Sequence, residues 1–313
     1  MPGRLVIAIT VGDPLGIGPE IAHKTAGDVG LKGRAKMRVY GERAAPESGV
    51  RGPTREGGEA SFRWVEEAIA DAKRPRGDAR RVDAIVTGPI SKEAWALAGH
   101  AWPGHTELLA ERFASPKSGM LFVGPRLRVI LATVHVPLVD VASVLTTARV
   151  LECIELGAQA CGEMGVKQPR VGVAGLNPHA GEHGLLGKED AGVIAPAVAQ
   201  ARANGLDVDG PVPGDVVFAR AAKGEYGLVV AMYHDQGLIP VKLLDRERSV
   251  NTTVGLVWAG ERIVRTSPAH GTAFDIAGKG VADATSMKAA VELAIELASM
   301  ADGTSAPPDT RPT

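Results

Sequence analysis

Residues 270–280 read His-Gly-Thr-Ala-Phe-Asp-Ile-Ala-Gly-Lys-Gly, and no other stretch of this chain is as informative about fold and function. Three glycines and two alanines among eleven residues leave little side-chain bulk, so the backbone can approach a flat ligand closely. The carboxylate of Asp275 can accept hydrogen bonds from two vicinal hydroxyl groups. A glycine-rich loop is more often only a turn, and the residues alone leave both interpretations open.

The same stretch resembles the adenosine-binding loop of the isocitrate/isopropylmalate dehydrogenase fold. The resemblance implies that Gly271, Thr272, Asp275 and Ile276 bind the adenosine half of a dinucleotide. In the NADP-dependent members of that fold a basic residue tends to stand at the position of Asp275, where it meets the 2′-phosphate. An acidic residue would repel that phosphate, so the resemblance implies NAD as the cofactor.

Composition excludes several classes of function. The chain has 313 residues, 45% hydrophobic and 23% charged, which is ordinary for a globular enzyme of two α/β lobes. A net charge near −1 and an aromatic content of 4% argue against nucleic-acid and membrane-surface partners. The first apolar run stops at Gly12, so it is too short for a signal peptide or a membrane span. We read Cys153 and Cys161 as buried free thiols and expect a cytoplasmic protein.

Short apolar runs alternate with longer amphipathic ones, which predicts an α/β fold with largely parallel sheets. Strands are predicted over 5–11, 37–40, 82–87, 129–134, 170–174 and 228–232. Helices are predicted over 19–26, 61–72, 92–98, 106–113, 148–164, 187–203 and 283–300. The segment 42–58 reads as a surface loop. Most candidate site residues follow a predicted strand, and ligands of open α/β sheets bind beyond the carboxyl ends of the strands.

The loop Gly12-Asp13-Pro14-Leu15-Gly16-Ile17-Gly18-Pro19-Glu20 joins a predicted strand to a predicted helix. Its glycines do not follow the GxGxxG order of a Rossmann fingerprint. Pro19 suits the first turn of a helix, and Glu20 suits the positive end of its dipole. Cofactor binding by Gly12 and Asp13 and a purely structural turn are equally compatible with these residues.

Three histidines, His135, His179 and His234, each follow a predicted strand. Neutral imidazoles held at strand ends suit a divalent transition metal such as Zn, Co or Mn, whereas Mg is an unusual fit. Their separations match no local metal-binding spacing, and each histidine taken alone is more often a structural hydrogen-bonding group.

Several polar residues can hold an anionic substrate. His105 and Thr106 open a predicted helix whose free N–H groups favour a carboxylate or phosphate. Lys242 lies in the apolar run Ile239–Leu244, where a cation is costly unless it is paired. Asn251 and Arg265 flank an apolar strand pair, and the guanidinium of Arg265 suits a planar or tetrahedral anion, although a surface ion pair is an equal alternative.

Motifs along nearly the whole chain resemble those of the 4-hydroxythreonine-4-phosphate dehydrogenase family of pyridoxine (vitamin B6) biosynthesis. They are GDPLGIGPEI, TGPISKEA, GHTELLA, GLNPHAGE, YHDQG, VNTTVGL, RTS and HGTAFDIAGKG. The resemblance implies that His135, His179 and His234 bind a divalent metal at a site completed across a homodimer interface. It also implies substrate contacts from His105, Thr106, Lys242, Asn251 and Arg265, and an acidic active-site residue at Asp215.

The resemblance further implies a discontinuous NAD-binding lobe of residues 1–115 plus 266–302. Residues 116–265 would form a central lobe for metal, substrate and dimerisation, and residues 303–313 a flexible tail. The chain departs from the family pattern at about five extra residues around Trp258–Arg262, which we expect to affect the substrate pocket, and at Ala269, where relatives usually have aspartate.

The expected reaction is an NAD-dependent, decarboxylating oxidation of a hydroxy acid. The metal would lower the pKa of the substrate hydroxyl, NAD would take the hydride, and the β-keto acid would lose CO₂. Lys242 is the first candidate for proton transfer, followed by Asp215 and Asp235. The leading substrate is 4-phosphohydroxy-L-threonine. The alternative substrates are 4-phospho-D-threonate, 4-phospho-D-erythronate and a cis-dihydrodiol dicarboxylate. A hypothesis from a different functional class is that the protein binds a metabolite without catalysing a reaction.

Overall fold

The computed structural model describes residues 4–42 and 52–301, so most of the predicted loop 42–58 and the predicted tail 303–313 lie outside the described residues. The chain forms two compact units: the first runs to Pro116 and resumes at Val250, and the second is Lys117–Ser249. We expected the chain to return to the first unit at residue 266. It returns at Val250 because β9 (Val250–Val254) pairs antiparallel with β12 (Val264–Pro268) inside the first unit.

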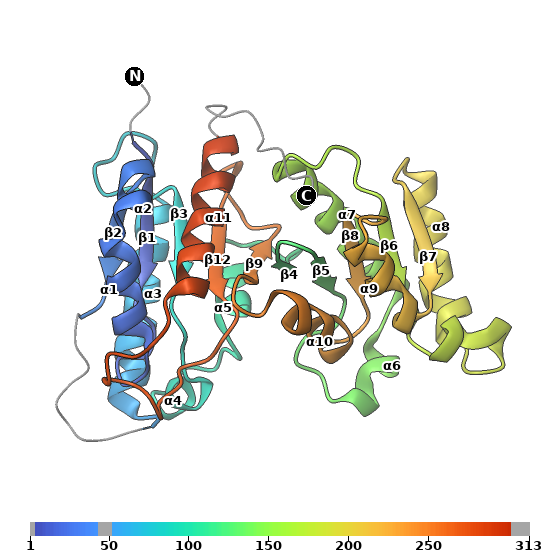
Figure 1. The fold of residues 1–313 in the computed structure, drawn as a ribbon, viewed down its shortest axis with the longest axis horizontal. Helices are drawn as coiled ribbons and strands as arrows, with labels where there is room; N and C mark the ends of the chain where they lie inside the picture. The colour runs from blue at the N-terminus through green and yellow to red at the C-terminus, as the bar shows by residue number, and fades with distance from the viewer. Residues whose placement is uncertain (1–3, 43–51, 302–313) are drawn as a thin grey trace. The chain divides into compact units, whose positions relative to one another are not determined.

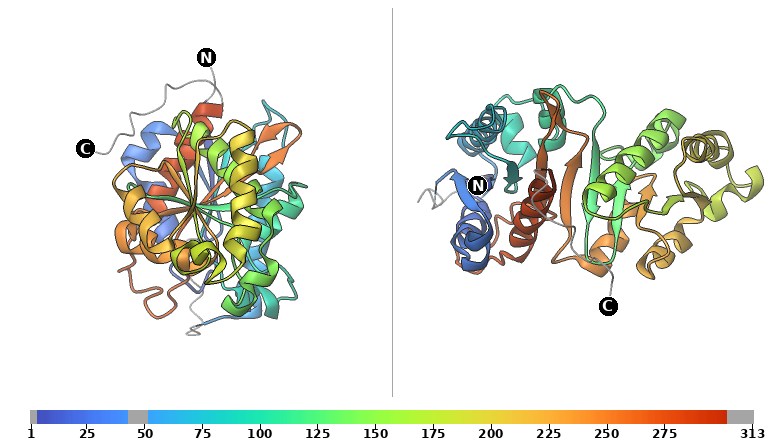
Figure 2. Two further views of the ribbon diagram at one scale, coloured as in Figure 1. Left: turned by 90° about the vertical axis from the view of Figure 1, so that its right-hand side faces the viewer. Right: turned by 90° about the horizontal axis from the view of Figure 1, so that it is seen from above.

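In the first unit the strand order is β2-β1-β3-β12-β9 (Figure 1). The first four strands are parallel, with β1 at Val6–Thr10, β2 at Lys36–Tyr40 and β3 at Ala84–Thr87. Right-handed crossovers from β1 to β2 and from β2 to β3 run in opposite directions along the sheet, so they place α1 and α3 on opposite faces. Figure 2 shows helices on both sides of this sheet. The helices are α1 (Gly18–Gly27), α2 (Val29–Arg34), α3 (Arg55–Ala72), α4 (Lys92–Leu97), α5 (His105–Arg112) and α11 (Thr285–Ala301).

In the second unit the strand order is β4-β5-β8-β6-β7. The strands β4 (Gly119–Val123) and β5 (Arg128–Leu131) form an antiparallel hairpin, and β5, β8 (Leu228–Ala231), β6 (Val171–Ala174) and β7 (Val208–Val212) are parallel. The remaining elements are η1 (Leu138–Asp140), α6 (Val141–Val144), α7 (Thr147–Glu163), η2 (Pro178–Gly184), the π-helix η3 (Asp190–Ile194), α8 (Ala195–Ala203), α9 (Gly214–Ala222) and α10 (His234–Asp245).

The α/β class is confirmed, and each of the six predicted strands coincides with an observed one. The unpredicted helix α10 contains both Gly237 and Pro240, which disfavour helix, yet it continues through them. Cys153 and Cys161 are buried free thiols as expected, and burial raises the pKa of each to about 11.

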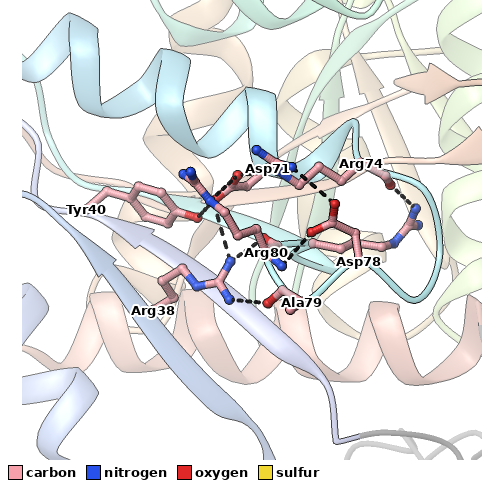
Figure 3. A network of polar contacts seen from close by, with 8 residues as sticks. Arg38, Tyr40, Asp71, Arg74, Asp78, Ala79 and Arg80 are labelled. Carbon is pink, nitrogen blue, oxygen red and sulfur yellow. Dashed lines mark hydrogen bonds and ion pairs between the residues drawn. The ribbon is translucent and has the colours of Figure 1, made fainter.

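A buried carboxylate ties three segments of the first unit together (Figure 3). The side chain of Asp71, at the end of α3, accepts hydrogen bonds from Tyr40 Oη at 2.8 Å, from Arg74 Nε at 2.8 Å and from Arg38 Nη1 at 3.4 Å. Arg80 Nε lies 3.3 Å from Asp71 Oδ1. Burial favours the neutral acid, but these donors outweigh it and lower the pKa of Asp71.

The extra residues form a short hairpin, β10 (Val257–Trp258) and β11 (Glu261–Arg262). Glu261 pairs with Arg76 at 2.8 Å and with Arg81 at 2.5 Å, and Lys73 Nζ lies 4.3 Å from the centre of a Trp258 ring. The hairpin precedes β12, so it lies at the strand end opposite to the loops that follow β1 and β3. These contacts do not support our expectation that the extra residues reshape the substrate pocket.

Candidate active site

Two segments that the sequence predicts to bind the cofactor lie against each other in the first unit. The loop after β1 contains Gly12 and Ile17, and the loop after β12 contains Thr272. The backbone N–H of Ile17 donates to the carbonyl oxygen of Thr272 at 2.9 Å. Gly12 has a φ of 79°, and a Cβ atom there would lie 2.2 Å from the carbonyl oxygen of Pro89, so only glycine fits at this turn.

Asp13 is fully buried beside Gly12. Its Oδ1 accepts a hydrogen bond from the N–H of Leu15 at 3.0 Å, whereas Oδ2 has no hydrogen-bond partner among the described residues. Burial raises the pKa of Asp13, and the hydrogen bond from Leu15 only partly offsets this. Buried polar atoms are nearly always paired, so Oδ2 is a candidate contact for a bound ligand.

The other predicted cofactor residues lie on an irregular loop. Gly271 and Asp275 are exposed, while Thr272 and Ile276 are partly buried. The N–H of Ile276 donates to the carbonyl oxygen of Ala273 at 3.2 Å, which closes a turn around Asp275. The carboxylate of Asp275 is therefore presented on a turn at the surface of the first unit.

Helix α1 anchors the C-terminal end of this loop. Glu20 Oε1 accepts a hydrogen bond from the N–H of Ala282 at 2.9 Å. Lys24 Nζ donates to the carbonyl oxygens of Gly280 at 3.2 Å and Ala282 at 3.0 Å, and it pairs with Glu20 at 2.7 Å. The loop is thus held at Thr272 by one end of α1 and at residues 280–282 by the next turns of the same helix.

Arg265 is a buried cation in the middle of the first sheet, with 2% of its surface exposed. Nη1 donates to Thr253 Oγ1 at 3.0 Å and Nη2 donates to Thr87 Oγ1 at 2.6 Å. Nε has no partner, and no carboxylate of the described chain forms an ion pair with the guanidinium. Burial lowers the pKa of Arg265 to about 10, with Glu107 opposing the shift. A buried guanidinium that hydrogen-bonds only to hydroxyl groups and leaves Nε unpartnered is costly, which makes Arg265 a strong candidate for binding an anionic ligand.

Three more predicted substrate-binding residues belong to the same unit. His105 begins α5 and is buried, and its Nε2 lacks a partner within the described residues, as does Asn251 Oδ1 on β9. Burial and the neighbouring charge of Arg265 hold the pKa of His105 well below 6.5, so the imidazole is neutral. Thr106 Oγ1 lies 3.3 Å from the same Thr253 hydroxyl that contacts Arg265. The structure therefore brings Arg265, His105 and Thr106 together, and Asn251 lies two residues from Thr253 on the same face of β9.

The three predicted metal ligands belong to the second unit. The rings of His135 and His234 are 6.0 Å apart between centroids, while His179 lies on η2. Within residues 4–42 and 52–301 there is no group of three His, Cys, Asp or Glu side chains that could hold a metal ion. One chain therefore does not assemble the predicted three-histidine site by itself.

The three histidines nevertheless fit a transition metal in donor type, and two of them have an orienting carboxylate. His179 Nδ1 lies 2.7 Å from Glu182 Oε2, and His234 Nδ1 lies 2.6 Å from Asp235 Oδ1. A carboxylate on Nδ1 fixes the tautomer and leaves Nε2 as the coordinating atom, which is the usual arrangement around protein-bound zinc.

The predicted proton-transfer residues are all exposed in the second unit. Asp215 lies in the first turn of α9, and Asp235 contacts His234. Lys242 lies on α10, and the expectation that it is embedded among apolar side chains is wrong. The run Ile239–Leu244 is helical, so its residues point in different directions, and Ile239 and Leu243 are themselves exposed.

Sequence reasoning missed residues whose contacts join distant segments. Thr87 and Thr253 hold the guanidinium of Arg265. Gln236 accepts a hydrogen bond from the N–H of Met232 at 2.7 Å and donates to the carbonyl oxygen of Gly175 at 2.7 Å, so it links the ends of β8 and β6. Gln236 lies inside the quoted YHDQG motif, which was the only available signal for it.

The fold is that of an α/β protein of the dehydrogenase type. The chain belongs to the family of the pyridoxal phosphate biosynthetic protein PdxA, whose model matches residues 22–294. The family resemblance seen in the sequence is thereby confirmed.

Two relatives illustrate the range of the family. The D-threonate 4-phosphate dehydrogenase of Cupriavidus necator is 41% identical over 94% of this chain and 97% of that protein. The 4-hydroxythreonine-4-phosphate dehydrogenase of Geobacter metallireducens is also 41% identical, over 93% of this chain and 95% of that protein. Both names are those of dehydrogenases, which agrees with the enzyme class expected from the sequence.

Solved structures agree on the fold. The 4-hydroxythreonine-4-phosphate dehydrogenase of Klebsiella pneumoniae superposes with a TM-score of 0.78 at 38% identity, covering 94% of this chain and 98% of that one. The isocitrate dehydrogenase of Methylococcus capsulatus, at 14% identity and a TM-score of 0.53 over 96% of this chain and 87% of that one, shares the fold alone.

Proposed function

We propose that the protein catalyses the NAD-dependent, divalent-metal-dependent oxidative decarboxylation of 4-phosphohydroxy-L-threonine. The observation that carries the proposal is the buried guanidinium of Arg265, whose hydrogen-bond partners are hydroxyl groups and whose Nε is unpartnered among the described residues. A phosphorylated hydroxy acid supplies both a phosphate and a carboxylate, and either anion would offset the cost of this buried charge.

His105, Thr106 and Asn251 would complete the anion site around Arg265. The neutral imidazole of His105 can donate from a ring N–H to a phosphate oxygen, and His105 lies at the N-terminus of α5, where free N–H groups favour an anion. Because His105 stays neutral, it adds a hydrogen bond to the site without adding a second buried charge.

A divalent metal would be held by His135, His179 and His234, and when bound it would lower the pKa of the substrate hydroxyl and polarise the neighbouring carbonyl. The carboxylates of Glu182 and Asp235 would hold His179 and His234 with Nε2 available. Gly271, Thr272, Asp275 and Ile276, together with Gly12 and Asp13, would position NAD, which accepts the hydride. Asp275 would receive the adenosine ribose hydroxyls and repel a 2′-phosphate, favouring NAD over NADP.

Lys242 remains the first candidate for holding or moving a proton, with Asp215 as the second. Asp235 is a weaker candidate, since its contact with His234 gives it an orienting role instead. The exposed position of Lys242 in one chain suits a group that acts at a surface which a second chain covers.

We further propose that the working form is a homodimer formed through the second unit, in the cytoplasm. Large apolar side chains are exposed on that unit, and an interface between two copies would remove such side chains from water. They are Leu138, Val139, Val144, Leu185, Leu186, Val216, Ile239 and Leu243. A second copy would cover them and would supply the histidine that one chain does not bring to the others. No helix of the described chain is long and apolar enough to cross a membrane.

The same chemistry on 4-phospho-D-threonate is the second candidate, because a relative of that name is as similar as one that acts on the amino acid. NADH formation should be measured with added Zn²⁺, Co²⁺ or Mn²⁺ on both compounds, on 4-phospho-D-erythronate and on a cis-dihydrodiol dicarboxylate. A preference of about 100-fold in kcat/KM, or about 2.7 kcal/mol, for 4-phosphohydroxy-L-threonine supports the proposal. A similar preference for a sugar acid or the diol moves the enzyme to a catabolic role, and no NADH from any substrate contradicts catalysis.

A further inference from the structure

The segment that carries His179 has an unusual backbone. His179, Ala180, Gly181, Glu182 and His183 all have left-handed dihedral angles, with φ of 53°, 53°, 79°, 43° and 59°. Residues other than glycine visit this region singly, because Cβ then crowds the following carbonyl oxygen at a cost of about 1–2 kcal/mol each. A full left-handed turn with four such residues persists only if its surroundings enforce it.

Asp190 holds the segment that leads into this turn. This carboxylate is buried and accepts hydrogen bonds from the N–H of Leu176 at 2.8 Å, from the N–H of Asn177 at 3.1 Å and from Asn177 Nδ2 at 3.0 Å. Asn177 Nδ2 also donates to Glu189 Oε2 at 2.8 Å. The start of the turn is therefore fixed from one side by Asp190 and Glu189, which lie where the π-helix begins.

The end of the turn is closed by backbone contacts. The N–H of Leu186 donates to the carbonyl oxygen of Gly181 at 3.1 Å, and a Cβ on Gly181 would lie 3.2 Å from Asp190 Cβ. The turn thus packs directly on the residue that clamps its start.

The spacing of residues in this turn has a chemical consequence for His179. In a three-residue helical turn, side chains three positions apart lie one above the other. This places Glu182 over His179, at 2.7 Å between Oε2 and Nδ1.

We propose that the left-handed turn is a device that presents Glu182 as the positioning residue of His179, with Asp190 as the clamp that holds the turn. The inference rests on the proposed function in one respect, namely that His179 is a metal ligand. Glu182 fixes the tautomer and direction of the imidazole before the metal binds. The conformational entropy of the His179 side chain is therefore lost during folding and does not reduce the affinity for the metal.

The test is Co²⁺ titration of the purified full-length protein, followed by the visible absorption band of bound Co²⁺, for wild type, Glu182→Gln and Glu182→Ala. Glu182 is about half exposed and its contact is with His179, so both variants should keep the thermal midpoint of the metal-free wild type. We expect the Kd for Co²⁺ to rise about 10–100-fold in Glu182→Ala and less in Glu182→Gln, whose amide oxygen still accepts from Nδ1. Glu225→Gln, which removes a carboxylate that pairs with Arg220 at 2.8 Å, is the matched control and should bind Co²⁺ as wild type does.

A second variant tests the clamp. Asp190→Asn should speed hydrogen exchange of the amides in residues 176–186 and weaken Co²⁺ binding together. A Kd within about twofold of wild type in Glu182→Ala overturns this inference alone, because wild-type binding still stands. A wild-type protein that takes up no Co²⁺ overturns the metal assignment in the proposed function and this inference with it.

Discussion

The guanidinium of Arg265 donates a hydrogen bond to the hydroxyl of Thr87 at 2.6 Å, and the two residues lie on neighbouring strands, β12 and β3. The hydroxyl offers a dipole but no charge, so it orients Arg265 without neutralising it. A carboxylate at the same position would form a buried ion pair and remove the attraction for an anionic substrate. The pair of Arg265 and Thr87 therefore keeps a positive charge buried, which lowers the stability of the folded chain.

Arg265→Met is predicted to separate binding from stability. Removing a buried charge that hydrogen-bonds only to hydroxyl groups should leave the free energy of unfolding unchanged or raise it by about 1 kcal/mol, whereas kcat/KM should fall by about 10³-fold, or about 4 kcal/mol. Urea unfolding and steady-state kinetics measure the two effects. A loss of more than about 2 kcal/mol in stability would show that Arg265 is a structural residue.

The lowered pKa of His105 predicts that the free energy of unfolding depends on pH. Its folded-state pKa lies well below 6.5, whereas the unfolded chain has the ordinary value, so below about pH 6.5 only the unfolded chain takes up this proton. The free energy of unfolding should then fall with decreasing pH, by up to about 1.4 kcal/mol per pH unit from this group. His105→Gln should show a shallower loss between pH 7 and 5 in urea titrations, and equal slopes for the two proteins would contradict the prediction.

Lys24→Met is predicted to weaken NAD binding, because Lys24 holds the carbonyl oxygens of Gly280 and Ala282. Losing hydrogen bonds from a charged donor frees the end of the cofactor loop, and we expect KM for NAD to rise about 5–20-fold with kcat little changed. The control is Lys288→Met, which breaks an exposed ion pair of 2.8 Å with Asp28 and does not touch the loop. An equal rise in KM in both variants would rule out a specific role for Lys24.

The sequence predicted the elements whose residues signal structure locally. Strands β1, β6 and β8 are continuous apolar runs buried on both faces, and such runs are visible without a structure. Strands β7 and β9 read Val-Asp-Gly-Pro-Val and Val-Asn-Thr-Thr-Val, where polar residues and proline hide the strand.

Site residues follow the same rule. Arg265, His105 and Asn251 were predicted as site residues because they stand in recognisable motifs. Thr87 and Glu182 were missed because their roles depend on contacts with other segments or on a backbone conformation that no local pattern encodes. The burial of Lys242 was misjudged because an apolar run says nothing of direction once it is helical.

Asp71→Asn is predicted to lower the free energy of unfolding by about 2–3 kcal/mol, since it removes the charge shared by Tyr40, Arg38, Arg74 and Arg80 (Figure 3). The pKa of Asp71 is lower folded than unfolded, so its contribution is present above about pH 4 and is lost as pH falls through its folded-state pKa. Urea unfolding at pH 7 measures the effect. A change below about 0.5 kcal/mol would mean that the network contributes no more to stability than ion pairs exposed at the surface do.

Leu243→Glu is predicted to prevent dimerisation. Leu243 is 81% exposed, and it shares a face of α10 with Ile239, which is 65% exposed four residues earlier. A carboxylate placed in an apolar interface must lose its hydration without gaining a partner, so the dimer should dissociate at micromolar concentration. Sedimentation should give the mass of one chain for Leu243→Glu and of two for wild type. Val29→Glu, at a position 85% exposed on the first unit, is the control and should stay dimeric.

Because the metal site is proposed to need both chains, the Leu243→Glu monomer should also lose Co²⁺ binding. A monomeric variant that binds Co²⁺ normally would show that one chain holds the metal alone.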